Sequence, residues 1–483
     1  MELVSARVVT RPPTRLPDGK RLPRGWSALE IGREEETSVH LRWPAWEGAA
    51  VGNGGRLRIT VALDYRDARF VEARLPGSGA LLGRFDIRYA YAFQPFELAL
   101  NAEQAAAALR EGVSLRLDGG EQPLWMFDEL DGEKDRRSFA PHLLLGEGAD
   151  GAEARLDAAM GRLASFASLQ PFGWMEGCVL DGLYALRPTL GAERIDAALD
   201  AHLAQYMDDE GRLLYEDLHG RGADDTFTTI EATLPLAVIA KYQPEHNVVK
   251  RAIAFWDSRG ANGGGAVIDG DTVSAEGAYT VAYPLAVVAA KHDRSDLARR
   301  ALEQALLRRD VLARDRDVFL RYHRNSDSHS FRNWARAYAW YMLGIARTAS
   351  TLRASAFADL PGVAELEREL ARVAEVALSW RQRSGLWSNF LDDPAVAVDA
   401  SGSAGIAAAL ALGARHGVLE ERYLRVAEES LTALAAYVTP DGFLGGVAQH
   451  NAGGVELQRG GYRVLSQMGL GLLGQLYAAV RGA

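Results

Sequence analysis

Cysteine is nearly absent from this chain of 483 residues, in which Cys178 is the only one. A single cysteine excludes an intramolecular disulfide and a cysteine-rich metal site, and it fits a reducing compartment. Long apolar runs are missing too. The N-terminal stretch MELVSARVVTRPPTRLP has no apolar core of signal-peptide length, and no run approaches about 18 apolar residues. These absences predict a cytoplasmic protein that does not enter a membrane.

Basic charge is also in short supply, since 64 Asp and Glu residues against 54 Lys and Arg give a net charge of −10. Broad attraction to nucleic acid or to an anionic membrane is therefore not expected. The motifs HExxH and GxSxG are absent, which argues against zinc proteases and the usual serine hydrolases. The small-residue runs Gly263–Gly265 and Ser401–Gly405 lack the lysine of a phosphate-binding loop. We expect no metal and no cofactor.

The first 145 residues carry short alternating runs separated by Gly, Pro and Asp turns. These runs are Ser38–Trp43, Leu57–Asp64, Phe70–Leu75, Phe85–Phe93 and Val113–Leu117. Alternation of this kind is typical of half-buried strands, and it predicts an antiparallel β-sandwich domain over residues 1–145 with one helix at Ala102–Glu111. The charged, Gly-rich segment Asp128–Gly151 is interpreted as a connection.

From Ala152 onward, nearly every long segment has helical periodicity. Six pairs can be laid out, and the second member of each is the more apolar. They are Glu153–Leu169 with Trp174–Leu186, Ala192–Tyr206 with Thr226–Lys241, Asn247–Asp257 with Ser274–Ala290, Arg294–Leu307 with Asn333–Thr348, Val363–Trp380 with Ser401–His416, and Glu420–Tyr437 with Tyr462–Val480. The linkers within pairs, such as Asp317–Tyr322, are interpreted as small hairpins. Twelve helices in six pairs indicate a repeat architecture.

An apolar helix can be buried only if its amphipathic partners surround it. Six pairs that close on themselves give an (α/α)6 toroid, which we predict for residues 146–483. An open solenoid is the alternative, but it needs polar helices at both ends, and Tyr462–Val480 is as apolar as the interior helices. The β domain should pack at the edge of the toroid, because its strand edges need covering.

The first residues of the inner helices should gather at one mouth of the toroid. They are Trp174, Glu176, Asp224, Asp225, Glu231, Glu276, Trp334, Arg336, Asp399, Ser401, Ser403, Tyr462 and Gln467. Aromatic faces stack on pyranose rings and arginine pairs with a carboxylate, so this set suits a sugar acid. Glu276 in the first turn of an apolar helix is a candidate for chemistry, with simple helix capping as the alternative.

Several tryptophan and histidine residues of the helical part also fit a purely structural role. Trp174, Trp340 and Trp387 fit packed core aromatics. His323 and His329 fit ordinary surface histidines in a polar loop.

At this point the residues resemble a known family, the unsaturated glucuronyl and rhamnogalacturonyl hydrolases of glycoside hydrolase families 88 and 105. The matching segments are Trp334–Trp340 (WARAYAW), Glu276–Tyr279 (EGAY), Leu391–Pro394 (LDDP) with the following SGSAG run, Gly173–Leu186 (GWMEGCVLDGLYAL) and Asp441–Val447 (DGFLGGV). They occur in the family's order over residues 153–483. The family's acid is an aspartate where this chain has Glu276, and the usual enzyme lacks the N-terminal β domain.

The resemblance implies hydrolysis of a terminal unsaturated uronic acid on an oligosaccharide. Glu276 would protonate the C4–C5 enol ether bond and then help a water attack, with Asp225 assisting and Asp224 and Glu231 as competitors for that second role. Two carboxylates facing each other repel, so we expect Glu276 to be the protonated one. The substrate-binding candidates are Trp174, Glu231, Tyr279, His329, Trp334, Arg336 and Ser403. A saturated glucuronyl substrate stays open as an alternative.

Two other functions stay open. A polysaccharide lyase or epimerase on the same toroid would need a Tyr/His pair, which Tyr279 with His323 or His329 could supply. A non-catalytic glycan-binding protein would use the β domain as its binding module. The predicted partner is an oligosaccharide with a uronic acid, with no nucleic acid and no membrane, and the oligomeric state is left open, a homodimer included.

Overall fold

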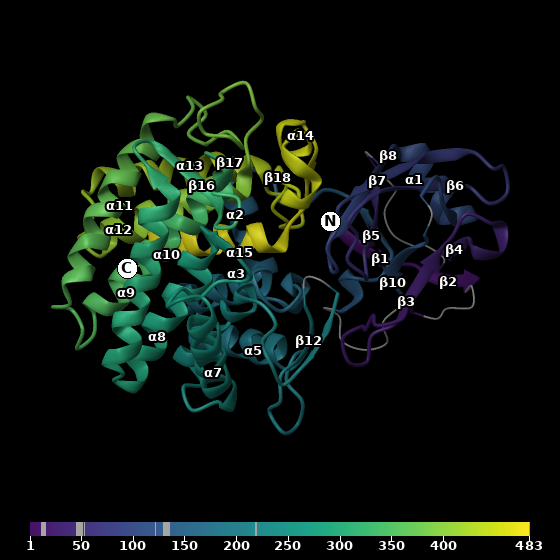
Figure 1. Ribbon diagram of the computed structural model, residues 1–483. Helices are drawn as coiled ribbons and strands as arrows, with labels where there is room; N and C mark the ends of the chain where they lie inside the picture. Colours follow the sequence, from purple (N-terminus) through teal and green to yellow (C-terminus); the bar gives the residue numbers. More distant parts are fainter. Residues whose placement is uncertain are drawn as a thin grey trace.

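The computed structural model describes residues 1–10, 16–44, 52, 54–120, 122–128, 136–217 and 220–482. Its two parts lie side by side: a large helical ring, coloured teal to yellow, and a smaller β-rich part, coloured purple to blue (Figure 1). The predicted fold class, a mainly helical toroid preceded by antiparallel sheets, is confirmed. Among the described residues, no helix combines the length and the apolar character needed to cross a bilayer.

The β-rich part contains two larger antiparallel sheets and one two-stranded sheet. The five-stranded sheet has the strand order β2 (Arg7–Thr10), β4 (Val39–Arg42), β9 (Val113–Leu117), β6 (Ala68–Arg74), β7 (Leu81–Arg88). The four-stranded sheet has the order β1 (Glu2–Ser5), β11 (His142–Leu145), β5 (Gly55–Thr60), β8 (Pro95–Leu100). The two-stranded sheet pairs β10 (Leu124–Phe127) with β3 (Ala28–Ile31). The predicted helix is α1 (Ala102–Glu111), and the Asn101 side chain caps it by accepting from the Gln104 N–H. Alternating apolar side chains thus pack between sheets.

Two expectations for this part were wrong. The run Phe85–Phe93 is a strand only as far as Arg88, because Tyr89 (φ 49°) and Phe93 (φ 67°) adopt left-handed backbone conformations that turn the chain into a tight loop. The presumed connection Asp128–Gly151 contains β11, which pairs with both β1 and β5 and is buried. Part of that segment, residues 129–135, lies outside the described residues.

Six outer and six inner helices form the ring within the described residues. The outer helices are α2 (Ala152–Leu163), α5 (Ala192–Leu203), α7 (Asn247–Asn262), α9 (Ser295–Leu312), α11 (Pro361–Ser379) and α13 (Arg422–Leu434). The inner helices are α3 (Trp174–Ala185), α6 (Leu236–Tyr242), α8 (Tyr283–His292), α10 (Ala335–Arg353), α12 (Ala400–Arg415) and α15 (Gln467–Arg481). Each inner helix contacts the next, and α15 contacts α3.

The contact between α3 and α15 closes the ring and excludes an open solenoid. A Cβ on Gly182 would collide with the carbonyl oxygen of Gly471, and a Cβ on Gly471 would collide with the backbone of Cys178. The two helices therefore meet backbone to backbone, which only glycine permits. The inner face is otherwise filled by the large apolar and aromatic side chains that the sequence concentrates in these helices.

Short strands and turns connect the helices at the rim of the ring. They are β12 (Leu214–Glu216) with β13 (Gly222–Asp224), β14 (Thr272–Ser274) with β16 (Asp317–His323), β15 (Ala313–Arg314) and β17 (Ser328–Arg332) also with β16, and β18 (Val447–Ala448) with β19 (Arg463–Val464), besides the short helices α4 (Arg187–Leu190) and α14 (Gly454–Arg459). The linker Asp317–Tyr322 is thus a hairpin strand, as predicted.

Two inner helices begin clearly later than predicted, α6 at Leu236 and α15 at Gln467, where Thr226 and Tyr462 were expected. In Thr226–Lys241 the chain forms only a short 3-10 turn, η4 (Ile230–Thr233), before α6, because the preceding threonines are poor helix formers and Pro235 cannot lie inside a helix. Ser274 is the last residue of β14, and the helix that follows starts at Glu276 and contains a π-helical turn, η5 (Ala278–Ala282), before α8. These irregular starts leave Glu231 and Glu276 on the rim.

A buried carboxylate lies at the centre of the ring. Asp181 accepts hydrogen bonds from the hydroxyls of Tyr279 (2.6 Å) and Tyr283 (2.9 Å). Its carboxyl oxygens lie 3.0 Å from Nε of Arg347 and 3.6 Å from Nζ of Lys241. Burial opposes the charge, but Arg347 and Lys241 outweigh it and hold the pKa of Asp181 below its ordinary value. The inner helices are thus joined by an ionic network.

The β-rich part packs directly against the ring. Arg58 on β5 is fully buried and pairs with Asp441 of the ring at 2.7 Å, and Asp441 also pairs with Arg162 of α2 at 3.0 Å. Elsewhere Lys20 pairs with Glu216 at 2.9 Å. From the end of β11 at Leu145 and the start of α2 at Ala152, we propose two domains, a β domain of residues 1–145 and a toroid of residues 146–483.

Candidate active site

A small cavity lies where the inner helices begin, at the face of the ring that the β domain covers. Its lining side chains are Tyr91, Trp174, Glu231, Glu276, Arg321, Trp334, Arg336, Trp340, His450 and Asn451. The free volume is about 20 Å³, which is room for one water molecule and not for a sugar ring. A substrate must therefore displace some of these side chains as it binds.

Two carboxyl groups face each other in this cavity, those of Glu231 and Glu276. They lie near enough for the charge of Glu276 to affect Glu231. Burial, followed by the neighbouring charge of Glu276, raises the pKa of Glu231 to about 8, while Arg321 opposes the shift. The raised pKa favours the neutral form of Glu231 near neutral pH. The sequence-based prediction gave the proton to Glu276.

The predicted partner of Glu276, Asp225, lies elsewhere. Its backbone is left-handed (φ 58°), and its carboxylate forms an ion pair with Arg251 of α7. Asp224 is exposed and pairs with Arg21 at 2.7 Å. Asp225 was expected to begin an inner helix, but η4 starts only at Ile230, so Glu231 takes the place facing Glu276.

Backbone contacts fix the segment that carries Glu276. The Ala275 N–H donates to the carbonyl of Leu320 on β16 at 2.8 Å, and the buried Arg308 donates through Nε to the Ser274 carbonyl at 3.0 Å. Gly277 has no Cβ, which leaves room for the Arg308 guanidinium directly beside it. Glu276 is the first residue of a helical run that continues through η5 into α8, so it lies in the first turn as predicted, and its side chain also lines the cavity.

Contacts between two rim turns hold Glu231. The Ile230 N–H donates to Oδ2 of Asp269 at 2.8 Å. Thr233 donates through Oγ1 to the carbonyl of Thr280 at 2.6 Å, which ties η4 to the π-helical turn η5. The two carboxyl groups are thus placed by neighbouring, mutually bonded segments.

Two arginines contribute positive charge to the cavity. A guanidinium nitrogen of Arg321 lies 3.8 Å from the Glu276 carboxylate. Arg336 lies over the ring of Trp334 at 4.5 Å, donates to the carbonyl of Gln449, and has a buried Nε with no hydrogen-bond partner. Burial lowers the pKa of Arg336, and Asp399, 3.9 Å away, opposes that shift. Each of the two arginines thus has one carboxylate within 4 Å, Glu276 beside Arg321 and Asp399 beside Arg336.

Aromatic side chains form the walls. Trp174 and Trp340 meet edge to face with ring centroids 5.5 Å apart, and Trp340 stacks on Tyr279 at 6.0 Å. Tyr91 of the β domain contacts Trp174 at 6.0 Å and His450 at 4.7 Å. Trp174 and Trp340 are therefore packed and also line the cavity. Trp387 is fully buried and donates to the carbonyl of Ala377, as the core interpretation expects.

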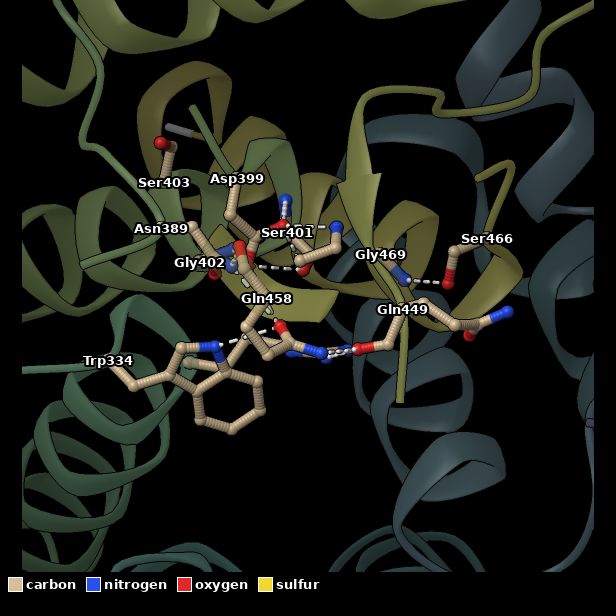
Figure 2. Close-up of polar contacts among 12 residues, drawn as sticks. Trp334, Asn389, Asp399, Ser401, Gly402, Ser403, Gln449, Gln458, Ser466 and Gly469 are labelled. Atoms are coloured by element: carbon tan, nitrogen blue, oxygen red, sulfur yellow. Dashed lines mark hydrogen bonds and ion pairs between the residues drawn. The ribbon is translucent and has the colours of Figure 1, made fainter. Parts of the chain in front are cut away.

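A polar network anchors the loop that carries His450 to the ring (Figure 2). Gln458 of α14 accepts from Nε1 of Trp334 at 3.2 Å and donates to the Gln449 carbonyl at 2.8 Å. Asn389 donates to the Gln458 carbonyl at 2.7 Å. Asp399 caps α12 and also accepts from the Ala448 N–H at 3.0 Å. One wall of the cavity is thereby built from three separate segments.

Three other predicted binding residues lie outside the cavity. Ser403 is fully buried one turn into α12, where its hydroxyl accepts from the Trp387 N–H at 3.0 Å. Tyr279 donates to Asp181 in the centre of the ring. His329 on β17 contacts the Val311 carbonyl at 2.9 Å, and His323 contacts Thr272. These residues stabilise the fold, so the Tyr/His pair proposed for a lyase does not form from Tyr279 with either histidine.

The structure brings together Trp174, Glu231, Glu276, Trp334 and Arg336, and it adds residues that the sequence analysis did not select. Arg321 was treated only as part of a hairpin. Tyr91 and His450 lie in loops whose positions depend on tertiary contacts. Among the residues that the structure describes, no group of three or more His, Cys, Asp or Glu side chains is arranged to hold a metal ion.

A closed ring of six helix pairs with two carboxyl groups at its mouth is the architecture of a toroidal sugar-processing enzyme. The sequence pattern of Glycosyl Hydrolase Family 88 matches residues 154–467, and the chain belongs to this family. It is therefore a glycoside hydrolase, and the predicted resemblance is confirmed. The comparison with curated proteins found no match.

Several solved structures share the fold. A possible member of glycoside hydrolase family 105 from Salmonella enterica is 18% identical, covers 68% of this chain and 93% of its own, and superposes with a TM-score of 0.57. A family 105 enzyme from C. acetobutylicum is 16% identical, with 69% and 99% covered and a TM-score of 0.57. The unsaturated glucuronyl hydrolase of Bacillus sp. GL1 is 16% identical, with 68% and 96% covered and a TM-score of 0.53. At these identities the likeness shows the fold.

Proposed function

We propose that this chain removes a terminal unsaturated uronic acid from an oligosaccharide by adding water across the C4–C5 double bond. The observation that carries the proposal is the Glu231–Glu276 pair, two carboxyl groups that line one small cavity together with Arg321 and Arg336. A similar structure, that of the Bacillus enzyme, is described as an unsaturated glucuronyl hydrolase responsible for the degradation of glycosaminoglycan. The family match supports a hydrolase acting on sugars.

The closeness of the two carboxyl groups favours an unsaturated over a saturated substrate. In glycosidases that cleave a saturated linkage, the two carboxyl groups flank the bond and lie about 5 to 9.5 Å apart. Glu231 and Glu276 line one small cavity, and the charge of Glu276 reaches Glu231, so the two carboxyl groups form one compact pair. A double bond needs its proton and its water at adjacent carbons, and one compact pair can serve both.

The pair divides the chemistry as follows. Glu231 gives its proton to C4, and Glu276 removes a proton from the water whose oxygen bonds to C5. The product is a hemiketal, whose ring opens and releases the remaining sugar with its hydroxyl group, so one water is consumed for each bond broken. The resemblance to the family suggested Glu276 as the acid. The raised pKa of Glu231 and the Arg321 contact to Glu276 support the reverse assignment.

The walls of the cavity match the rest of the sugar. Arg321 and Arg336 supply positive charge for the uronate carboxylate, and Trp174 supplies an aromatic face for the ring. The direct test is incubation with unsaturated uronic disaccharides, followed by ultraviolet absorbance. Loss of absorbance is expected because the conjugated double bond disappears. Unchanged absorbance on all such disaccharides would reject the proposal.

A polysaccharide lyase is the second candidate, and one observation favours it. Tyr91 and His450 form a Tyr/His pair in the cavity with ring centroids 4.7 Å apart. A lyase creates the double bond that a hydrolase removes, so intact polyuronates would gain absorbance in the same assay. A protein that bound the glycan without changing absorbance in either direction would instead be the non-catalytic binder.

The rate should fall as the pH rises through about 8, because Glu231 must keep its proton to act as the acid. Arg321→Ala removes a cation that lowers the pKa of Glu231, so the pH at which the rate falls should be higher in this variant. Glu276→Gln removes the charge that raises it, so the fall in the residual rate should move to lower pH. The measurement is kcat/KM against pH, and shifts in the opposite directions would contradict the proton assignment.

We also propose, from the single cysteine, a cytoplasmic location, and an oligosaccharide with a uronic acid as the partner. Fractionation of cells producing the protein tests the first. Size-exclusion chromatography decides between a monomer and the homodimer that the sequence left open.

A further inference from the structure

A second, larger cavity lies between the β domain and the toroid. Its volume is about 480 Å³, which is within the range of pockets that hold small ligands. The β domain contributes Asp64, Tyr91 and Phe93, and the toroid contributes residues around Phe172 and Tyr215. Tyr91 lines this cleft and the catalytic cavity alike, so the two spaces meet at its side chain. We call this space the interdomain cleft.

The chemistry of the interdomain cleft differs from that of the catalytic cavity. Phe172 and Tyr215 pack with ring centroids 4.9 Å apart, and the Tyr215 hydroxyl accepts from the Thr228 N–H. Because that hydroxyl already has a hydrogen-bond partner, Tyr215 mainly presents the carbon atoms of its ring to the cleft. Aromatic carbon beside polar groups is what sugar rings bind, because a pyranose has apolar C–H faces and hydroxyl edges.

The charges in the cleft disfavour an anionic occupant. Each arginine that lines it already pairs with a carboxylate: Arg21 with Asp224 at 2.7 Å, Arg24 with Asp209 at 3.7 Å, and Arg212 with Asp208 at 2.7 Å. Burial raises the pKa of Asp64 to about 7. The lining carboxylates of Glu216 and Asp217 pair with Lys20 at 2.9 Å and with Arg221 at 2.8 Å, so the described lining keeps no unpaired cation for an anionic ligand. Carboxylates accept hydrogen bonds from sugar hydroxyls and repel sulfate or uronate groups.

Tyr91 provides an independent pointer to a ligand. Its side chain is 6% exposed, yet its hydroxyl has no hydrogen-bond partner. A buried hydroxyl left unpaired costs about 1–3 kcal/mol, so such a group needs an explanation. The loop that holds it is strained at Tyr89 and Phe93, both left-handed. A substrate spanning both cavities would pass this hydroxyl and could satisfy it.

We propose that the interdomain cleft binds the uncharged sugars to which the terminal uronate is attached, with the Tyr91 hydroxyl at the junction. The inference rests on the proposed function and adds the class of substrate. The β domain is then part of the substrate site, and the enzyme prefers oligosaccharides whose sugars next to the uronate carry no sulfate or carboxylate.

Filling the cleft tests the proposal. Ala204 is exposed and lines the cleft at the end of α5, whereas Ala201, on the same helix, is exposed outside it. Ala204→Trp should lower kcat/KM about tenfold for an unsaturated uronate linked to a neutral disaccharide, and leave the unsaturated uronate methyl glycoside within about twofold. Ala201→Trp is the matched control and should change neither. Equal effects of Ala204→Trp on both substrates, or no effect on either, would overturn the proposal.

A second experiment tests how the charge of the substrate affects cleavage. For the unmodified protein, kcat/KM should be at least about tenfold higher for the neutral trisaccharide, the unsaturated uronate linked to a neutral disaccharide, than for its sulfated counterpart. Asp209→Lys should reduce this difference in kcat/KM. Preference for the sulfated sugar would overturn the inference. Tyr91→Phe keeps the ring and should lower kcat/KM more for the trisaccharide than for the methyl glycoside. Failure to cleave the methyl glycoside at all would instead reject the proposed function itself, so the two failures are distinguishable.

Discussion

Replacing Glu231 with glutamine is expected to slow hydrolysis of an unsaturated uronic disaccharide by at least about 100-fold, the low end for a lost general acid. Glutamine keeps the size and hydrogen bonding of the side chain but cannot release a proton at neutral pH. The substrate should therefore still bind, with a dissociation constant within a few-fold of that of the unmodified protein. Initial rates from ultraviolet absorbance and titration calorimetry measure the two quantities.

Asp225→Asn is the matched control for this experiment. Asp225 lies on the same connecting segment but pairs with Arg251 away from the cavity, so its loss should change the rate by no more than a few-fold. A large loss of rate in Asp225→Asn together with near-normal activity in Glu231→Gln would restore the pairing expected from the sequence. Glu276→Gln should also be slow, because the base that activates water is then missing.

Replacing Asp181 with alanine is expected to lower the free energy of unfolding of the toroid by about 3–5 kcal/mol. The change leaves Arg347 and Lys241 buried at the centre of the ring without the carboxylate that balances them, and it removes the acceptor of the Tyr283 hydroxyl and one of the two acceptors of the Tyr279 hydroxyl. Urea denaturation followed by circular dichroism measures the loss.

An exposed pair supplies the comparison for Asp181. Asp296 forms an ion pair with Arg294, but about half of each side chain is accessible to water. Asp296→Ala should therefore cost less than about 1 kcal/mol. If Asp181→Ala were equally mild, the central network would contribute little to stability, and the two buried cations would have to be balanced by other groups.

Helix pairing could be predicted because it follows from composition. Each inner helix is more apolar than its outer partner and buries most of its surface, so it has no stable place except inside a ring of amphipathic partners. The helix Ala102–Glu111 and the strand Val113–Leu117 were also predicted with the bounds that the structure has, since Asn101 and Gly112 mark the helix ends clearly.

The carboxyl pair could be predicted only in part. Glu276 and Glu231 were both among the candidates, but the partner chosen for Glu276 was Asp225. That choice assumed that the helix begins at Thr226, whereas the threonines and Pro235 delay it. Which residue faces a cavity depends on where the first helical turn starts, and a shift of a few residues moves a side chain into the cavity or out of it.

Tyr91, Arg321 and His450 carried no signal that the sequence could provide. Each lies in a loop or hairpin with ordinary neighbours, and each reaches the cavity through contacts with segments far away in the chain. Ser403 was predicted to bind substrate because of its neighbours in the sequence, and the structure places it outside the cavity. It shares a small-residue run with the start of α12 but lies one turn too deep, so its hydroxyl serves the backbone of Trp387.

The meeting of Gly182 and Gly471 also determines when the toroid can finish folding. α3 is among the first helices of the ring to be synthesised and α15 is the last, so the seam between them cannot form until nearly the whole chain has left the ribosome. Until then the apolar sides of α3 and α12 that α15 covers remain open to water and to other unfinished chains. Chains that stop before α15 should therefore aggregate, however well their earlier helices pair.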